Sequence, residues 1–449
     1  MTRGQDHSSA DVIVHKYARS SEHPPVLGRF LPGLILLMLA IMFSGAERYF
    51  VTLSSILHYG FSVVLVVAVI IVAIAERRGP YVARSVGAYL AWLFLFFAWG
   101  ILVSDAPAGA ISRVVSELVL NALVTTAIAV VVSSRQRLQQ FAELLQLAVI
   151  ANAVVIAAES LSPEIFDLLG ALYAHLSPGA FFTARPAGLW LQPNDAGMAL
   201  VFAFLIATWA RPPLKWLGRA AAAYGVYMGA SKGAMYALVA VLLVLGFAEL
   251  RLAFRRRSRW LLIGSPLIAA CLSVTLFGSV NQAEFLAANS EMPYPVQRFI
   301  DITSVQDQND PSRVSLASSW LVDLSSNPWI GNGVFTFEGT DTRPGAHDLY
   351  IAVWGDSGIL FLLGLILIYL TGALAVWRHH VRGADMLAVS LIWIVYIFDG
   401  FISHDQFFAI MLMMALALAL VLPALLELGP AQGTGSAFGS QEPEGPGGK

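Results

Sequence analysis

The stretch Asn281–Asp356 reads NQAEFLAANSEMPYPVQRFIDITSVQDQNDPSRVSLASSWLVDLSSNPWIGNGVFTFEGTDTRPGAHDLYIAVWGD and stands between two strongly apolar segments. Unpaired backbone groups and charges are costly inside hydrocarbon, so a polar block of this length has to lie outside the lipid. The block also holds Arg298, Arg313 and His347. It is therefore the first place to look for chemistry.

The composition places the chain among membrane proteins. It is 57% hydrophobic and 12% charged, with a mean hydropathy of +0.70, whereas soluble domains carry roughly 25% charged residues. One cysteine, Cys271, excludes an internal disulfide and a cysteine metal cluster. With 27 basic and 29 acidic residues, the chain has no general attraction to nucleic acid.

Apolar windows of about 17–25 residues predict membrane-spanning helices. We expect an all-α polytopic membrane protein of about twelve such helices, with one large extracytoplasmic loop that carries short amphipathic helices. The expected spans are 28–46, 53–75, 84–103, 114–132, 140–160, 194–210, 214–230, 233–250, 259–279, 356–377, 384–402 and 405–427.

The placement of arginine and lysine gives the orientation, because short cytoplasmic loops are enriched in these residues. On strictly alternating loops, the clusters fall on the side of the amino terminus: Arg77, Arg78 and Arg84; Arg135 and Arg137; Arg211, Lys215 and Arg219; Arg251 to Arg259; and Arg378 and Arg382. We therefore expect cytoplasmic, disordered tails over 1–27 and 428–449. The spans would fill 28–279 and 356–427, and the 280–355 loop would be extracytoplasmic.

Several segments of the outer side carry structural signals. We interpret about Leu161–Asp195 as a loop, whose stretch TARPAGLWLQPND holds Arg185 among apolar neighbours. Gly229–Gly233 predicts a tight turn with Lys232. Asp310-Pro311 begins a helix that we expect to lie on the membrane surface until Asn327-Pro328 ends it. A glycine-bent turn over Pro328–Gly333 follows, and a second short amphipathic run begins at His347.

His347 is the sharpest candidate for catalysis. An imidazole titrates near neutral pH, so at the mouth of a cavity it can accept a proton from an attacking hydroxyl. The alternative is a surface or helix-capping histidine. Its place on the same side as several isolated cations favours a functional role.

Those cations are Arg185, Lys232, Arg298 and Arg313. A diphosphate held at a membrane surface needs two or more positive groups, and the planar fork of arginine matches phosphate oxygens. The alternative is contact with lipid headgroups or pairing with nearby acids. For Arg298 both interpretations stay open, whereas Arg185 and Arg313 favour function.

Other constellations are weaker. Asp399, His404 and Asp405 could hold a divalent ion, but no further ligands accompany them, so we interpret them as wet turn residues or as the lining of an acceptor entrance. With no stronger group of ligands in the sequence, we expect no metal and no cofactor. The expected spans also lack the chain of acids or histidines that proton-coupled pumps use.

Taken together, the segments resemble the O-antigen ligase and polymerase superfamily, which are membrane glycosyltransferases that use undecaprenyl-diphosphate-linked sugars. The resemblance rests on short motifs over about Arg185–Leu370: Arg185-Pro186-Ala187-Gly188, Ser231-Lys232-Gly233-Ala234, Arg313, Pro328 with Gly331 and Gly333, His347-Asp348-x-Tyr350, and Gly358.

The resemblance implies a metal-independent active site on the periplasmic side of the bacterial inner membrane. His347 would assist the acceptor hydroxyl, Arg185 and Arg313 would bind the lipid diphosphate, and Asp348 and Tyr350 would support the site. The chain departs from the family pattern in two places. Lys232 stands where arginine is common, and Asp348 stands where asparagine often follows the histidine; Asp348 either favours the protonated form of His347 or caps the helix.

The expected function is the transfer or polymerisation of undecaprenyl-diphosphate-linked repeat units, as in an exopolysaccharide or O-antigen polymerase. The partners would be the lipid-linked glycan donor, a glycan or glycolipid acceptor, membrane lipid and other envelope polysaccharide assembly proteins. One alternative is an O-antigen ligase that transfers glycan to lipid A-core. Two alternatives from other classes are a transporter or flippase of a lipid-linked or polar solute, and a non-catalytic assembly subunit.

Overall fold

A computed structural model describes residues 26–49, 55–104, 108–176, 185–190, 192–254, 320–325, 327–333, 339–340, 343–344, 348–378, 383–401 and 409–427. The ninth expected span, the carboxy-terminal tail, nearly all of the amino-terminal tail and most of the 280–355 loop lie outside these ranges. The statements below concern the described residues.

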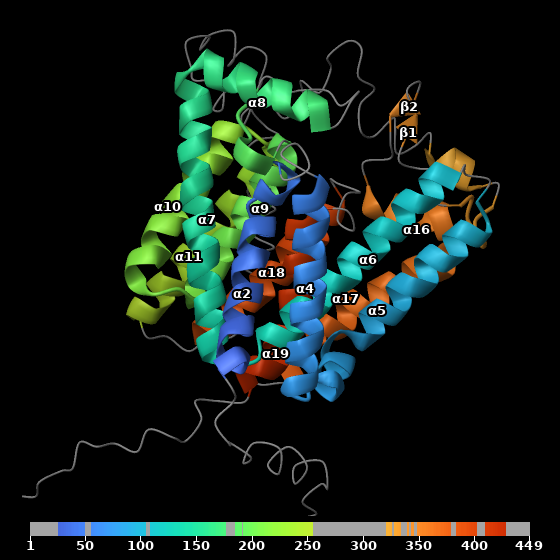
Figure 1. Ribbon diagram of the computed structural model, residues 1–449, viewed down its shortest axis with the longest axis horizontal. Coiled ribbons are helices and arrows are strands. Elements are labelled where there is room, and N and C mark those ends of the chain that lie inside the picture. The colour runs from blue at the N-terminus through green and yellow to red at the C-terminus, as the bar shows by residue number, and fades with distance from the viewer. Residues whose placement is uncertain are drawn as a thin grey trace, which may run out of the picture.

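The described residues form a helical bundle with one two-residue β-ladder (Figure 1). The elements are α2 (Val26–Phe43), η1 (Ala46–Arg48), α4 (Ser55–Ala75), α5 (Gly79–Leu102), α6 (Ala108–Val131), α7 (Arg135–Leu161), α8 (Pro163–Leu176), η2 (Gly188–Trp190), α9 (Pro193–Ile206), η3 (Ala207–Trp209), α10 (Pro212–Gly229), α11 (Lys232–Phe254), β1 (Gly339–Thr340), β2 (Arg343–Pro344), α16 (Leu349–Ser357), α17 (Ile359–Arg378), α18 (Gly383–Gly400) and α19 (Ile410–Glu427). In the ladder, Gly339 pairs with Pro344 and Thr340 with Arg343, antiparallel.

Helices coincide with every expected spanning range except 259–279, which is not described. Within the described part of the chain, four helices are long and apolar enough to cross a membrane: Gly79–Leu102, Val114–Val131, Arg135–Leu161 and Ile359–Val376. Others, such as Ile410–Leu426, are apolar but shorter. The protein is thus an α-helical membrane protein by length and composition, and the count of twelve spans stays a prediction.

The centre of the bundle is formed by two helices that are apolar all round. From Ala409 to Ala419 no side chain is more than 7% exposed, and the side chains of Met198–Ile206 on α9 are buried to the same degree. A helix that is hydrophobic on every face needs neighbours on every face. Accordingly, α19 lies against α2, α5, α6, α17 and α18.

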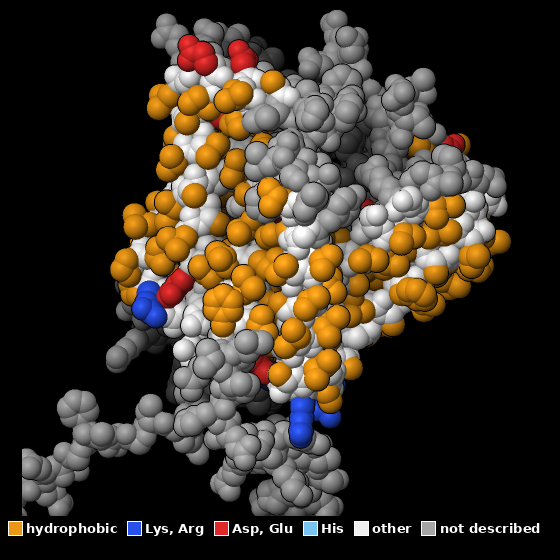
Figure 2. All heavy atoms as spheres, in the orientation of Figure 1, with side chains coloured by type: hydrophobic (Ala, Val, Ile, Leu, Met, Phe, Trp, Pro, Cys, Tyr) orange, Lys and Arg blue, Asp and Glu red, His pale blue; other side chains and the backbone are white. Residues whose placement is uncertain are grey.

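The outer surface of the bundle is apolar as well. Large side chains such as Ile74, Val154 and Leu360 are more than half exposed, and Figure 2 shows hydrophobic side chains across most of the described face. A water-soluble protein rarely exposes a contiguous apolar surface of this extent. Lipid is the solvent that suits such a surface.

Charged side chains pair at one end of the bundle, which we call the basic end: residues 76–78, 133–137, 209–215, Asp385 and Leu426. Arg135 forms an ion pair with Asp385 at 3.0 Å, and Arg211 with Glu143 at 3.0 Å. The indole nitrogen of Trp209 donates to the other oxygen of Asp385 at 3.0 Å. Loops that strict alternation assigns to one side therefore lie at one end, which supports the alternation.

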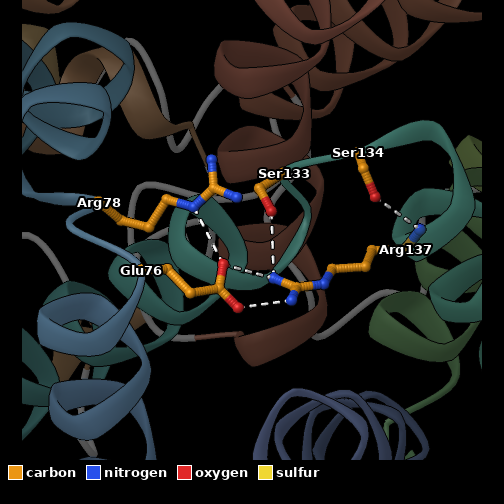
Figure 3. Close-up of polar contacts among 5 residues, drawn as sticks. All are labelled: Glu76, Arg78, Ser133, Ser134 and Arg137. Carbon is orange, nitrogen blue, oxygen red and sulfur yellow. Dashed lines mark hydrogen bonds and ion pairs between the residues drawn. The ribbon is translucent and has the colours of Figure 1, made fainter. Parts of the chain in front are cut away.

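The tightest of these contacts centres on Glu76 (Figure 3). Both terminal nitrogens of Arg137 donate to its carboxylate, one of them at 2.9 Å, and Arg78 Nε donates to it at 3.1 Å. Burial acts to raise the pKa of Glu76, but the hydrogen bonds and charges of Arg137 and Arg78 outweigh it, so the pKa lies below its usual value. Ser134 also accepts the amide of Arg137 at 3.2 Å and caps α7.

The opposite end, which we call the loop end, consists of residues 185–190, 230–233, 328–333 and 348–358. The loop end lies in the upper half of Figure 1, where α8 and α16 are labelled. One expectation needs correction there, because Pro163–Leu176 forms helix α8 within the stretch 161–195 that we interpreted as a loop.

The surface helix expected from Asp310 is described only from Trp320 onward. Its residues Trp320 and Leu324 pack against α16, while Leu321 and Val322 are exposed.

Acid should weaken the Glu76 cluster. Because the folded-state pKa of Glu76 is lowered, its carboxylate contributes stability above the ordinary glutamate pKa and loses it as the pH falls towards the folded-state value. We expect the unfolding midpoint of the detergent-solubilised protein to fall more between about pH 5 and about pH 3 in the wild type than in Glu76→Gln.

At neutral pH, Arg137→Ala should cost about 1 kcal/mol, a value discounted for partial exposure. The exposed Arg84 on α5 provides the matched control, and Arg84→Ala should leave the midpoint unchanged. Equal acid sensitivity of wild type and Glu76→Gln would show that the cluster does not stabilise the fold.

Candidate functional site

The segment 185–190 is held against the end of α7 by two buried polar side chains. The carboxylate of Glu159 accepts the backbone amides of Ala187 at 3.1 Å and Gly188 at 2.7 Å. Two turns earlier on α7, the side-chain oxygen of Asn152 accepts the amide of Leu189 at 2.8 Å. Gly188 has a φ of +61°, and a Cβ there would collide with the side chain of Asn152, so the position requires glycine.

Trp190 fixes the same segment to α2. Its indole nitrogen donates to the carbonyl of Phe43 at 2.6 Å, and its ring meets the Phe43 ring edge to face with centroids 6.2 Å apart. The side chain is fully buried. Three anchors on two helices therefore hold a segment of only six residues.

Arg185, at the start of this segment, reaches the turn between α10 and α11. Its Nη1 donates to the carbonyl of Ala230 at 3.2 Å. Ala230 ends α10 in the left-handed region with a φ of +48°, Ser231 is buried, and Lys232 begins α11. The tight turn predicted over 229–233 is thus present, and the structure brings the segments of two candidate cations into direct contact.

The chemistry of this pair of segments suits an anion. Arg185 and Lys232 stand on segments that touch through the Ala230 carbonyl, and positive side chains on neighbouring segments attract a negative group. The first turn of α9 contributes Asp195, 9% exposed, and α9 packs closely on the turn at Gly197, where an added Cβ would stand 3.0 Å from Cβ of Ser231. Phosphate oxygens are the natural ligands of such cations.

A second part of the loop end is built around α16. The Asp348 side chain accepts the amide of Ile351 at 2.9 Å and so caps the helix. Burial raises the pKa of Asp348, partly countered by its backbone hydrogen bonds. Of the two roles left open for Asp348, the structure shows the helix cap. Its effect on His347 stays a prediction, because His347 lies outside the described residues.

Tyr350 ties α16 to the end of α18. Its hydroxyl donates to the carbonyl of Ile397 at 2.9 Å, and its ring lies 4.6 Å from that of Phe401, centroid to centroid. Burial is the main cause that raises the pKa of Tyr350, and the charges of Asp348 and Asp399 add to it. The side chain thus stays neutral and supports the position of α16.

The turn 327–333 is clasped to the break between α16 and α17. Asn332 and Gly333 donate their amides to Gly355 and Asp356 at 2.7 and 3.0 Å. At the break, Gly358 has a φ of +90°, and a Cβ there would collide with the carbonyl oxygen of Trp329. The expected glycine-bent turn is confirmed, with positive φ at Gly331 and Gly333.

The indole nitrogens of Trp99 and Trp354 donate to the carbonyls of Ile330 and Pro328, at 2.9 and 2.8 Å. Two indole side chains, one on α5 and one on α16, therefore fix the backbone of this turn.

The described residues leave part of the predicted site untested. Arg298, Arg313, His347, His404 and Asp405 lie outside the described ranges, and Asp399 is buried at the end of α18. Among the described residues, no three of the His, Cys, Asp and Glu side chains group closely enough to hold a metal ion.

Sequence reasoning missed the role of Glu159 as the acceptor for the 185–190 segment. The available signal was the pair Asn152 and Glu159, two polar residues seven apart on one face of an apolar helix.

The fold and site define a class: an α-helical membrane protein with a polar, cation-bearing cluster at one end of its bundle. The comparisons do not narrow this class. No protein-family model matches the chain, and no curated protein matches its sequence.

Removing the carboxylate acceptor should loosen the 185–190 segment. We expect Glu159→Leu to speed hydrogen exchange at the amides of Ala187 and Gly188, because each buried donor loses a partner worth about 1–3 kcal/mol. Glu159→Gln keeps one acceptor oxygen and should have a smaller effect. The measurement is hydrogen exchange by mass spectrometry on peptides that cover the segment.

Glu164→Leu, on the exposed surface of α8, controls for the loss of a nearby carboxylate. Unchanged exchange in Glu159→Leu would contradict the assignment of Glu159 as the anchor.

Proposed function

We propose that this protein is a membrane glycosyltransferase that polymerises undecaprenyl-diphosphate-linked glycan repeat units, as an exopolysaccharide or O-antigen polymerase does. The proposal includes about twelve spans in a bacterial inner membrane, with both termini in the cytoplasm and the loop end in the periplasm. It is supported by the motifs shared with the ligase and polymerase superfamily. The single observation that carries it is the hydrogen bond from Arg185 to the Lys232 turn.

In the proposed reaction, the acceptor hydroxyl attacks the anomeric carbon of the donor sugar with inversion. His347 takes the hydroxyl proton, the glycosidic carbon–oxygen bond to the diphosphate breaks, and the lipid diphosphate leaves with its electron pair. Arg185, Lys232, Arg298 and Arg313 would hold the diphosphate. Fixed cations stabilise the charge that develops on the leaving group without having to reorganise during the reaction.

The anchoring of Arg185 supports this role over a casual contact with lipid headgroups. A headgroup contact needs only a long, freely moving side chain. In this protein the backbone that carries Arg185 is held by Glu159, Asn152 and Trp190, so the start of its side chain has a defined position. Preorganisation of that kind is what electrostatic catalysis requires.

The alternative of a transporter or flippase expects charges along the middle of several spans. The buried charged side chains among the described residues are Glu47, Glu159, Asp195 and Asp399, and each stands within a turn or two of the end of its helix or in a short 3-10 turn. The polar groups deeper in the bundle are uncharged, such as Asn121, which accepts from Tyr89 at 3.1 Å. This distribution favours surface chemistry at one end of the bundle.

Arg185 and Lys232 should act on the same diphosphate. In liposomes that contain purified protein and lipid-linked oligosaccharide on one face, we expect Arg185→Ala and Lys232→Ala each to lower kcat/KM by about 10²–10³. The double variant should lose less than the product of the two single effects, because both cations serve one anion. Arg84→Ala at the basic end provides the matched control.

Independent effects of the two variants, or full elongation by both, would remove the shared diphosphate site. Movement of intact donor across the bilayer without elongation would instead establish the flippase.

His347 carries the acid–base part of the proposal. We expect His347→Ala to reduce elongation by about 10²–10⁴ while donor binding is retained, because only the proton acceptor is lost. Arg313→Ala should weaken donor binding as well. The measurement is the chain length of envelope glycan in cells, matched with donor binding to the purified variants. Full-length polymer from both stably inserted variants would end the proposed mechanism.

If transfer is shown, the acceptor decides between polymerase and ligase. Growth of the glycan on its lipid carrier supports polymerisation, whereas transfer to added lipid A-core supports the O-antigen ligase alternative.

A further inference from the structure

Helix α8 is a separate helix and not an extension of α7. α7 ends at Leu161, and Ser162 is extended, with φ −131° and ψ 108°. The Ser162 hydroxyl accepts the amide of Ile165 at 3.3 Å and donates to Glu164 at 2.9 Å, while Pro163 occupies the first helical position. Serine as cap and proline at the first position are the signals that start a new helix. Figure 1 shows α8 running across the end of the bundle, away from the direction of α7.

The described side chains of α8 divide into three stripes at helical spacing. Phe166 and Leu169 are half-buried and Gly170 is buried, which marks the stripe that faces the protein. Glu164 and Asp167 form an exposed polar stripe, and the exposed Ala171 lies beside them. Between these two, Ile165 and Leu168 form a third stripe that is apolar and 37% and 60% exposed.

Along the chain, the apolar stripe of α8 follows an exposed apolar stripe of α7. On α7, which is long and apolar enough to cross a membrane, Leu147, Val154 and Leu161 recur every seventh residue and are 50%, 64% and 85% exposed. Residues seven apart lie on the same side of a helix. Ile165 and Leu168 follow directly after the bend. Figure 2 shows acidic side chains at the outermost end of the molecule, near α8, with hydrophobic side chains beneath them.

We propose that α8 lies in the lipid–water interface of the membrane that α7 crosses, with Ile165 and Leu168 among the acyl chains and with Glu164 and Asp167 in water. The partner is the phospholipid bilayer itself. A second protein chain suits the patch less well, because two side chains are far smaller than the roughly 1,000 Å² that a specific interface buries. This proposal does not depend on the proposed glycosyltransferase activity.

The polar stripe of α8 is acidic, whereas peripheral helices that bind anionic membranes by attraction are rich in lysine and arginine. Contact with the bilayer is therefore hydrophobic in origin, and the covalent link to α7 makes electrostatic attraction unnecessary.

Spin labelling tests the position of α8. The chain has a single cysteine, so Cys271→Ser gives a background for one-at-a-time labels at positions 164, 165, 167 and 168. Val154→Cys provides the lipid reference and Ala171→Cys the water reference. The labelled full-length proteins are placed in phosphatidylcholine–phosphatidylglycerol vesicles, and relaxation by oxygen, which partitions into lipid, is compared with relaxation by a water-soluble nickel chelate.

We expect the oxygen-to-nickel ratio at 165 and 168 to shift towards that at 154, and the ratio at 164 and 167 to match that at 171. High nickel access at 165 and 168, equal to that at 164 and 167, would place the helix in water and overturn the proposal. Exclusion of both reagents at 165 and 168 would mean that protein covers the stripe, which overturns it as well. Each stripe has two positions, so one variant that fails to fold leaves the comparison intact.

Discussion

The Glu159 carboxylate is 6% exposed and would be strongly unfavourable there without hydrogen-bond donors. Two backbone amides of the 185–190 segment supply them. The amides depend on the carboxylate in the same way. They lie among apolar side chains, so each of them needs a hydrogen-bond acceptor within the protein. One buried carboxylate thus fixes the shape of the segment, and through it the starting point of the Arg185 side chain and the contact between that side chain and the α10–α11 turn.

The same constraint accounts for the distribution of charge over the whole described structure. Ion pairs at the basic end join loops that lie far apart in the sequence, as Glu76 with Arg137 and Arg135 with Asp385. At the loop end, charge is instead met by backbone groups, as at Glu159 and Asp348. The basic end therefore balances positive charge with carboxylates, whereas at the loop end two carboxylates accept hydrogen bonds from backbone amides.

Much of the helical framework could be predicted from the sequence, because an apolar stretch of about twenty residues has few alternatives to a helix in lipid. The tight turn before Lys232 and the glycine turn after Pro328 were also predictable, since both depend on local residue types. Helix α8 was not, because fourteen residues with acids among them resemble a loop. The anchoring by Glu159 was not predictable either, because it joins groups 28 residues apart.

Asp348 illustrates the same limit at a single residue. Its sequence position allowed either a helix cap or a partner of His347, and only the 2.9 Å contact with the amide of Ile351 identifies the cap. For His347, Arg298 and Arg313 the sequence argument stands alone.

The α16–α17 break around Gly358 is held in the same way as the 185–190 segment. The α16–α17 break could be made by any flexible connection, yet it is held by hydrogen bonds from the 327–333 turn and by the indoles of Trp99 and Trp354. Like the 185–190 segment, it is an irregular stretch of backbone fixed at several points by groups on separate helices. Irregular backbone at the boundary of a membrane protein is stable only when its polar groups are satisfied within the protein. Two such stretches lie at the same end of the bundle, one of them carrying Arg185 and the other joining α16 to α17. For the proposed diphosphate site, a backbone fixed in this way would hold Arg185 in position when the anion arrives.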